Sequence, residues 1–209
     1  MPPASVARRR RVRGEHVRLV RVLVRCHVGQ ARVPELIVDA LEERLGLETD
    51  WRTATDLGCG TGLAGMLLRP RVGRLVGVDL SQTMLDRARR RNLYDQLTQA
   101  NLVSFLHGET ESFDVVVAAD VFCYFGVLDE VIAGAAHALR PGGVIAFTVE
   151  SLPEGSDGWS LALTGRYAHS PRYITAAMVG FDAVAIDPCE LRMEAGRPVP
   201  GLRVIARRR

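Results

Sequence analysis

The feature that most constrains this fold is the alternation of short apolar segments with helical segments along the middle of the chain. Alternation of this kind predicts a parallel sheet that is covered by helices on both faces, with right-handed crossovers. The predicted strands of this series are residues 53–57, 74–79, 96–100, 113–119 and 144–150. The predicted helices between them are residues 63–68, residues 82–91, a short helix that ends at residue 106, and residues 127–139. A further helix, begun by Pro34 and ended by Gly46, precedes the first strand.

The C-terminal part departs from this alternation. Residues 181–191 and 199–207 have the pattern of two strands, and a turn through Gly196 and Pro198 joins them without a helix. Strands joined in this way pair antiparallel. We therefore expect an α/β fold with a doubly wound, Rossmann-like, seven-stranded sheet that is mostly parallel and has a C-terminal antiparallel strand pair. We expect residues 1–26 to be a basic N-terminal extension and residues 27–209 to be the domain.

Arginine supplies all 27 basic residues of the 209-residue chain, and lysine is absent. This excludes a Gly-Lys-Ser/Thr phosphate loop, a pyridoxal Schiff base and the Tyr-x-x-x-Lys pair of many reductases. Eight arginines and only one acidic residue fall within residues 1–25, so the rest of the chain is mildly acidic. Any contact with nucleic acid is therefore confined to the basic N-terminus. Other interpretations of this segment are a surface helix, a contact with an anionic membrane and a transit peptide.

The cysteines and the hydropathy pattern bear on location. Cys26, Cys59, Cys123 and Cys189 show no Cys-x-x-Cys spacing, so the sequence predicts no metal site and no redox pair. No apolar run approaches the roughly 20 residues of a membrane span, and the N-terminal segment lacks the apolar core of a signal peptide. We expect a cytoplasmic protein with reduced thiols and no membrane partner. The sequence leaves the oligomeric state open.

A glycine-rich turn follows the first predicted strand. Asp56, Gly58, Gly60 and Gly62 mark it, and Asp79 ends the next strand seventeen residues after Gly62. Alternate glycines let the backbone pass close to a ligand, and a carboxylate at the second strand end can accept both hydroxyls of a ribose. The pattern predicts a nucleotide-like ligand at the carboxyl ends of the strands. A nicotinamide cofactor is one alternative, but Gly58 interrupts the strand too early for it, and the acid at position 56 suits a positively charged group.

Four segments in sequential order resemble the motifs of class I S-adenosylmethionine-dependent methyltransferases. These segments are residues 56–62, 76–81, 113–120 and 139–143. Residues 118–125 and 165–170 resemble more narrowly a bacterial group of predicted methyltransferases, some of which carry TPR repeats, although no such repeat is present here. The resemblance covers residues 33–209. It implies methyl transfer from S-adenosylmethionine to a nucleophilic acceptor, and the acidic domain without an RNA-recognition insert favours a small molecule as the acceptor.

The resemblance also implies roles by position. Asp56 and Asp120 would lie at the methionine end of the cofactor, and Asp79 would hold the ribose. Leu80 and Met84 would flank the adenine, and Asn101 would accept from its amino group in place of the usual Asp. The cofactor-binding set that the resemblance implies is Asp56, Gly58, Cys59, Gly60, Gly62, Asp79, Leu80, Met84, Asn101, Leu102 and Asp120. Asn101 and the lack of aromatic residues before residue 34 leave an alternative open, a cofactor-binding protein with little or no catalysis that acts as a regulatory or assembly partner.

His169, Tyr124 and Tyr167 are the candidate catalytic residues. Tyr124 follows the fourth predicted strand, and residues 166–170 are expected to form a loop over the same edge of the sheet. If the acceptor must lose a proton, His169, Tyr124 and Glu150 are the candidate bases in that order. The alternative interpretation is that Tyr167 and His169 only brace neighbouring strands.

Three further side chains bear on the site. Arg166 could pair with an acidic group on the acceptor. Cys59 is interpreted as a small residue that fills the tight glycine turn, and Cys123 is not expected to be a nucleophile because it lacks a Pro-Cys context.

Overall fold

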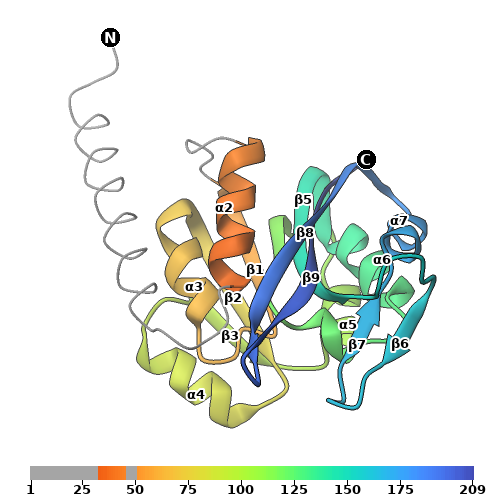
Figure 1. Cartoon of the computed structure of the whole chain (residues 1–209). Coiled ribbons are helices and arrows are strands. Elements are labelled where there is room, and N and C mark those ends of the chain that lie inside the picture. Colours follow the sequence, from red (N-terminus) through yellow and green to blue (C-terminus); the bar gives the residue numbers. More distant parts are fainter. Residues whose placement is uncertain (1–32, 46–50) are drawn as a thin grey trace.

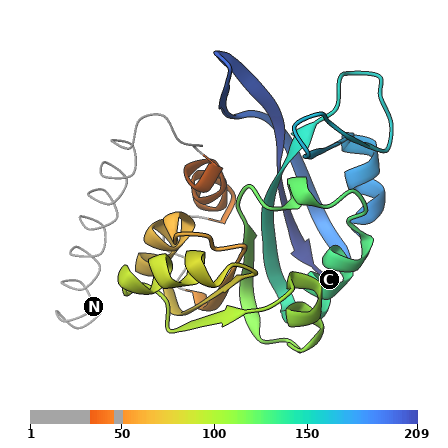
Figure 2. The same cartoon turned by 90° about the horizontal axis from the view of Figure 1, so that it is seen from below.

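The computed structural model describes residues 33–45 and 51–209. A nine-stranded sheet forms its centre, and five parallel strands lie in the order β3-β2-β1-β4-β5. These strands are β1 (Trp51–Leu57), β2 (Val72–Asp79), β3 (Gln96–Gln99), β4 (Phe113–Ala118) and β5 (Leu139–Ser151). Their carboxyl ends point toward the bottom of Figure 1, and Figure 2 looks onto that edge. The strand order reverses at β1 and β4, so ligands of such sheets bind beyond these two strand ends.

Helices cover both faces of the sheet (Figure 1). On one face lie α2 (Val33–Leu45) and α3 (Leu63–Leu68), and on the other lie α5 (Leu102–His107), α6 (Asp129–Ala138) and α7 (Pro171–Ala177). The strands serve both layers: Val115 and Val117 pack toward α2 and α3, whereas Val116 and Ala118 pack toward α5 and α6. Successive side chains of a strand point to opposite faces, so each central strand is apolar throughout.

Three further elements connect these layers. The helix α4 (Gln82–Arg90) packs beside β2 and β3, where Ser81 caps its first turn. The short 3₁₀ turn η1 (Arg69–Arg71) precedes β2, and a second one, η2 (Phe122–Tyr124), follows β4.

The antiparallel pair at the C-terminus is confirmed. It consists of β8 (Phe181–Glu194) and β9 (Arg197–Arg208), and β9 pairs with β5. Two short strands, β6 (Trp159–Leu161) and β7 (Tyr167–His169), add to the seven that the sequence predicts. Strand β7 pairs in parallel with Glu150 and Ser151 at the end of β5, so the prediction of a loop at residues 166–170 is wrong. Strands of three residues are too short to show a hydrophobic period, which is why the sequence did not reveal them.

The predicted N-terminal extension, residues 1–26, lies outside the described residues, as do its arginines and Cys26. Within residues 33–45 and 51–209, no helix combines the length and the apolar character needed to cross a bilayer.

Candidate functional site

The turn after β1 is built from glycines with left-handed backbone conformations. The φ angles of Gly58, Gly60 and Gly62 are 61°, 51° and 86°. At Gly58 a Cβ atom would lie only 2.3 Å from Cγ2 of Val121, so position 58 has no room for a side chain. The amide of Cys59 donates to the carbonyl of Val78 at 3.0 Å, which ties the turn to β2. The turn therefore presents bare backbone at the carboxyl edge of the sheet, where a ligand can approach closely.

Asp79, at the end of β2, joins two turns of this edge. Its Oδ2 accepts the amide of Gly60 at 2.9 Å, and its Oδ1 accepts the amide of Ser81 at 2.8 Å. Each carboxylate oxygen has a second lone pair, so Asp79 can still accept ligand hydroxyls. Leu80 and Met84 follow it with 65% and 37% of their surfaces exposed, which leaves two apolar side chains free to flank a flat ring.

Asp56 lies beneath the glycine turn and is only 1% exposed. The hydroxyl of Tyr94 donates to its Oδ2 at 2.6 Å. Burial is the main cause that raises the pKa of Asp56 to about 7; the charge of Asp79 adds to the rise, and the hydrogen bonds from Tyr94 and the Gly65 amide oppose it. Tyr94 stands before β3 in a segment without a recognisable motif, so no sequence pattern pointed to it.

The other residues expected near the adenine have different partners. Oδ1 of Asn101 accepts the amides of Val103 and Ser104 at 2.9 and 3.3 Å, so this oxygen caps α5. Leu102 is buried, with 5% of its surface exposed. Its side chain packs in the core with α5 and α6. The predicted contact of Asn101 with an adenine amino group would therefore compete with a helix cap.

A cluster of five charged side chains lies beyond the ends of β4 and β5, and we call it the rim charge cluster. Its members are Asp120, Glu150, Arg166, Arg192 and Glu194. Three carboxylates against two guanidinium groups leave it with a formal charge of one minus. Arg192 and Glu194 come from β8, far along the chain from the motifs, so no sequence pattern pointed to them.

Arg192 is the centre of this cluster. Its Nη1 donates to Asp120 at 3.1 Å, its Nε donates to Glu194 at 2.6 Å, and its Nη2 donates to Glu150. Only 9% of its side chain is exposed. Because the planar guanidinium has its donors in a fixed fork, one residue orients three carboxylates here.

Tyr124 and Arg166 form the outer part of the same edge. Cζ of Arg166 lies 5.9 Å from the ring centroid of Tyr124, and its Nη1 donates to Glu194 at 2.5 Å. Tyr124 is 59% exposed. The structure therefore brings Tyr124, Arg166 and Asp120 to one place, as the sequence predicts for residues that follow strand ends.

His169 occupies a different position from the one expected. It is fully buried in β7, its Nε2 lies 3.1 Å from the carbonyl oxygen of Gly126, and its ring stacks on Tyr173 at 5.6 Å. Burial lowers its pKa. Tyr167 packs edge to face on Trp159 at 5.4 Å. These contacts favour bracing roles for both residues, and a general base at His169 would have to reach an acceptor from inside the core.

Both cysteines of this region have packing environments. Cys59 and Cys123 are 5% and 1% exposed. Burial, together with nearby carboxylates, raises the pKa of Cys123 to about 12 and that of Cys59 further still. The thiols are therefore protonated at neutral pH, as expected for packing residues and not for nucleophiles.

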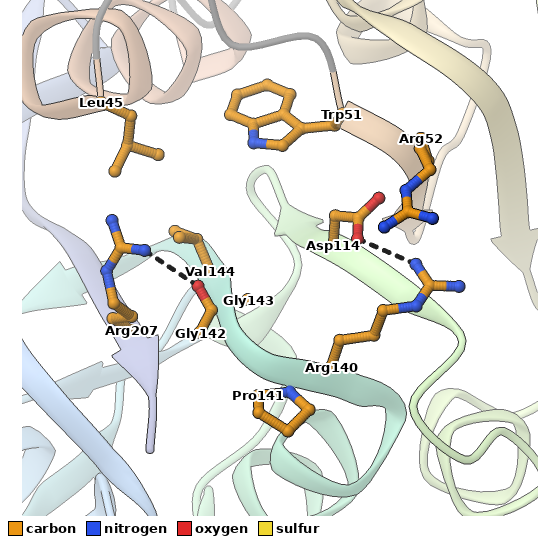
Figure 3. Close-up of a pocket in the computed structure, with 10 residues that line it drawn as sticks. All are labelled: Leu45, Trp51, Arg52, Asp114, Arg140, Pro141, Gly142, Gly143, Val144 and Arg207. Carbon is orange, nitrogen blue, oxygen red and sulfur yellow. Dashed lines mark hydrogen bonds and ion pairs between the residues drawn. The ribbon is translucent and has the colours of Figure 1, made fainter.

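A cavity of about 440 Å³ lies at the opposite, amino-terminal edge of the parallel strands (Figure 3). Trp51 and Arg52 of β1 line it together with Asp114, Arg140 and Arg207. Nη1 of Arg140 donates to Asp114 at 2.9 Å, and Nη1 of Arg207 donates to the carbonyl of Gly142 at 3.0 Å. These contacts join the start of β5 to the start of β4 and to the end of β9, and the cavity is separate from the glycine turn.

The fold and the site together define an α/β domain whose carboxyl sheet edge has the features of a nucleotide-type cofactor site. Residues 55–145 match the family model of a methyltransferase domain. Malonyl-[acyl-carrier protein] O-methyltransferase of Salmonella typhimurium is 31% identical over 118 residues, which cover 55% of this chain and 47% of the relative. The chain is therefore similar to methyltransferase domains over residues 55–145, and its fold is similar to that of S-adenosylmethionine-dependent methyltransferases.

Solved structures share the fold. A protein of Listeria monocytogenes described as an S-adenosylmethionine-dependent methyltransferase has a TM-score of 0.64 at 18% identity, over 84% of this chain and 99% of that one. The phosphoethanolamine N-methyltransferase 2 of Haemonchus contortus, in complex with phosphomonomethylethanolamine and S-adenosylhomocysteine, has a TM-score of 0.66 at 17% identity, over 82% of this chain and 52% of that one. The chain spans about half the length of the curated relatives it matches. The resemblance to a TPR-carrying group stays a prediction.

Proposed function

We propose that this chain binds S-adenosylmethionine between the turns after β1 and β2 and transfers its methyl group to a small-molecule acceptor at the rim charge cluster. The observation that carries the proposal is the pair formed by the bare glycine turn and Asp79, whose carboxylate spans Gly60 and Ser81. We assign residues 27–209 to the catalytic domain and residues 1–26 to an N-terminal extension. Any contact with nucleic acid would be made through this extension. The free thiols of Cys59, Cys123 and Cys189 support a cytoplasmic location, which cell fractionation would test.

The residues present fit this cofactor. Gly60 offers open space beside bare backbone, Asp79 offers acceptors for ribose hydroxyls, and Leu80 and Met84 offer apolar surface for the adenine. Asp56 and Asp120 supply negative charge near the end of β1 and β4, where the methionine ammonium group would lie. The cluster around Asp120 carries one surplus negative charge, which suits a ligand with a positive sulfonium centre.

S-adenosylmethionine supplies a methyl group that its sulfonium already makes electrophilic. The protein's part is then to hold donor and acceptor in line and to exclude water, which can contribute several kcal/mol, on the order of 7 or more. Arg192 fixes Asp120 and Glu150, so the walls of the site are rigid before any ligand binds. This preorganisation is what an in-line transfer needs.

We propose an acceptor with an acidic group. Arg166 is held mainly by Glu194, whose side chain is 36% exposed, so an acceptor's acid can reach Arg166 and replace Glu194 as its partner. The malonyl group in the name of the Salmonella relative is acidic as well. If the acceptor must lose a proton, Tyr124 is the accessible candidate base, ahead of the buried His169 and the half-buried Tyr167.

Calorimetry with S-adenosylhomocysteine tests the cofactor site. Asp79→Ala should weaken binding by about 1.5–3 kcal/mol for each charge-assisted bond lost. Asp86→Ala, on the exposed side of α4, is the control and should leave affinity unchanged. Unchanged affinity in Asp79→Ala would remove this residue from the site, and tighter binding of NAD than of S-adenosylmethionine would overturn the proposal.

Catalysis needs a separate test. Purified protein is incubated with methyl-labelled S-adenosylmethionine and a metabolite extract that has been fractionated by charge. Label is expected in the anionic fraction, and Arg166→Met should reduce it. Tight cofactor binding without transfer to any fraction would instead support the second candidate, a cofactor-binding regulatory or assembly protein.

A further inference from the structure

Tyr94 is the common neighbour of three glycines around the cofactor edge. A Cβ atom at Gly65 would lie 2.3 Å from the Tyr94 hydroxyl oxygen, and Cβ atoms at Gly77 and Gly62 would lie 2.8 and 3.2 Å from its ring. Gly62 and Gly65 belong to the turn and helix after β1, whereas Gly77 belongs to β2. The ring of Tyr94 therefore occupies a space that these three positions leave open by lacking side chains.

The segment that carries Tyr94 is tied to the surrounding strands on both sides. The amide of Asp95 donates to the carbonyl of Leu75 at 2.9 Å, and Oδ2 of Asp95 accepts the amide of Leu75 at 2.7 Å. Nε of Arg91 donates to the carbonyl of Thr61 at 2.7 Å, in the glycine turn itself. The position of the Tyr94 ring is thus set by contacts of Arg91 and Asp95 that do not depend on the Tyr94 hydroxyl.

The hydroxyl has one clear partner, the buried carboxylate of Asp56, at 2.6 Å. The groups that act on Asp56 are this hydroxyl, the amide of Gly65 and the carboxylate of Asp79, and the thiol of Cys59 lies close by. None of these groups is cationic. Asp56 in its ionised form therefore depends on the two hydrogen bonds and on whatever positive group a ligand brings to it.

We propose that Tyr94 is a positioning residue for the ammonium end of the cofactor, because its hydroxyl holds Asp56 ionised and oriented beneath the glycine turn. This inference rests on the proposed function, since the positive group is that of a methionine moiety. It separates two roles of one side chain: the ring supports the turn, and the hydroxyl sets the charge that the ammonium group meets.

Two ligands and one conservative variant test the proposal. S-adenosylhomocysteine carries the ammonium group, whereas 5′-methylthioadenosine has the same adenosine without it. Tyr94→Phe keeps the ring, so its affinity for methylthioadenosine should equal that of the wild type. Its affinity for S-adenosylhomocysteine at pH 7 should fall about tenfold, as expected when one hydrogen bond to a charged group is lost. Tyr173→Phe, which removes a hydroxyl bound to Asp129 and Leu128 in the α7 region, is the matched control and should change neither affinity.

The pH profile provides a readout that a structural role would not move. The ammonium group binds ionised Asp56, so the affinity for S-adenosylhomocysteine should decrease as the pH falls from 8.5 to 6 and Asp56 is protonated. Removing the Tyr94 hydroxyl raises the pKa of Asp56 further, so this decrease should begin at a higher pH in Tyr94→Phe than in the wild type. Asp56→Asn should bind this ligand weakly at every pH in that range, and adding Tyr94→Phe to it should cause no further loss.

The outcomes are distinct. Equal losses for both ligands in Tyr94→Phe, or no loss for S-adenosylhomocysteine, would overturn the positioning role. A further loss of S-adenosylhomocysteine affinity on adding Tyr94→Phe to Asp56→Asn would overturn it as well. A wild-type protein that binds neither ligand would instead refute the proposed function, on which this inference depends.

Discussion

Gly58→Ala perturbs the cofactor turn at its tightest point, and the structure gives two separate costs for it. The φ angle of 61° is in the left-handed region, where a side chain costs about 1–2 kcal/mol. The new Cβ would also lie 2.3 Å from Cγ2 and 3.0 Å from Cγ1 of Val121, and overpacking of this kind costs about 1–3 kcal/mol. The free energy of unfolding should therefore fall by about 2–5 kcal/mol.

Two further variants separate these costs. Gly155→Ala, at a φ of 82° with no atom within 4 Å of its Cβ position, has only the backbone cost and should lose about 1–2 kcal/mol. Val121→Ala removes both clashing methyl groups, so Gly58→Ala should cost about 1–3 kcal/mol less in the Val121→Ala background than in the wild type.

Urea unfolding of the four variants, with calorimetric titration of S-adenosylhomocysteine alongside, measures both effects. Gly58→Ala should also weaken binding of this ligand, whereas Gly155→Ala should not. If Gly58→Ala and Gly155→Ala destabilise the protein equally and Val121→Ala gives no relief, the close approach of Val121 to the turn does not exist in solution.

Three other perturbations follow from buried groups. The pKa of Asp56 is raised from 3.8 to about 7, so its contribution to the free energy of unfolding is fully present below pH 4 and is lost as the pH rises through 7. Urea unfolding without ligand should show that the free energy of unfolding falls by a few kcal/mol over this range, on the order of 1.4 per pH unit. Asp56→Asn should abolish this pH dependence. Arg192→Met leaves Asp120 and Glu150 without their cation and should lower the free energy of unfolding by about 3–5 kcal/mol, measured with urea at pH 8. His169→Ala should lower it by roughly 1–3 kcal/mol while the methyl-transfer rate of the folded protein changes little; a rate that falls by ~10²–10⁴-fold at constant stability would restore His169 as a base.

The turn after β1 could be predicted from sequence because its determinants are local. Asp56, the three glycines and Asp79 stand at strand ends, and parallel strands bring their carboxyl ends to one edge wherever the crossovers are right-handed. The same reasoning predicted α3 and α4, since apolar periodicity and capping chemistry act within a few residues.

Other features depended on which distant segments meet. His169 was expected on a surface loop, but three residues of β7 pair with the end of β5 and bury it. The neighbouring strand supplies a partner that the residue type by itself does not indicate. The cause at Asn101 is local instead: its oxygen caps α5, because that helix begins immediately after it.

The sequence by itself determined the doubly wound sheet, its antiparallel C-terminal pair and the cofactor edge, because alternating strands and helices and a glycine turn are patterns of neighbouring residues. Only the tertiary structure decided which charges meet. Arg192 of β8 reaches Asp120 across 72 positions, and the Tyr94 hydroxyl reaches Asp56 across 38. Ion pairs and buried hydrogen bonds act over a few ångströms in space, so they are set by how strands and turns pack and leave no period along the chain.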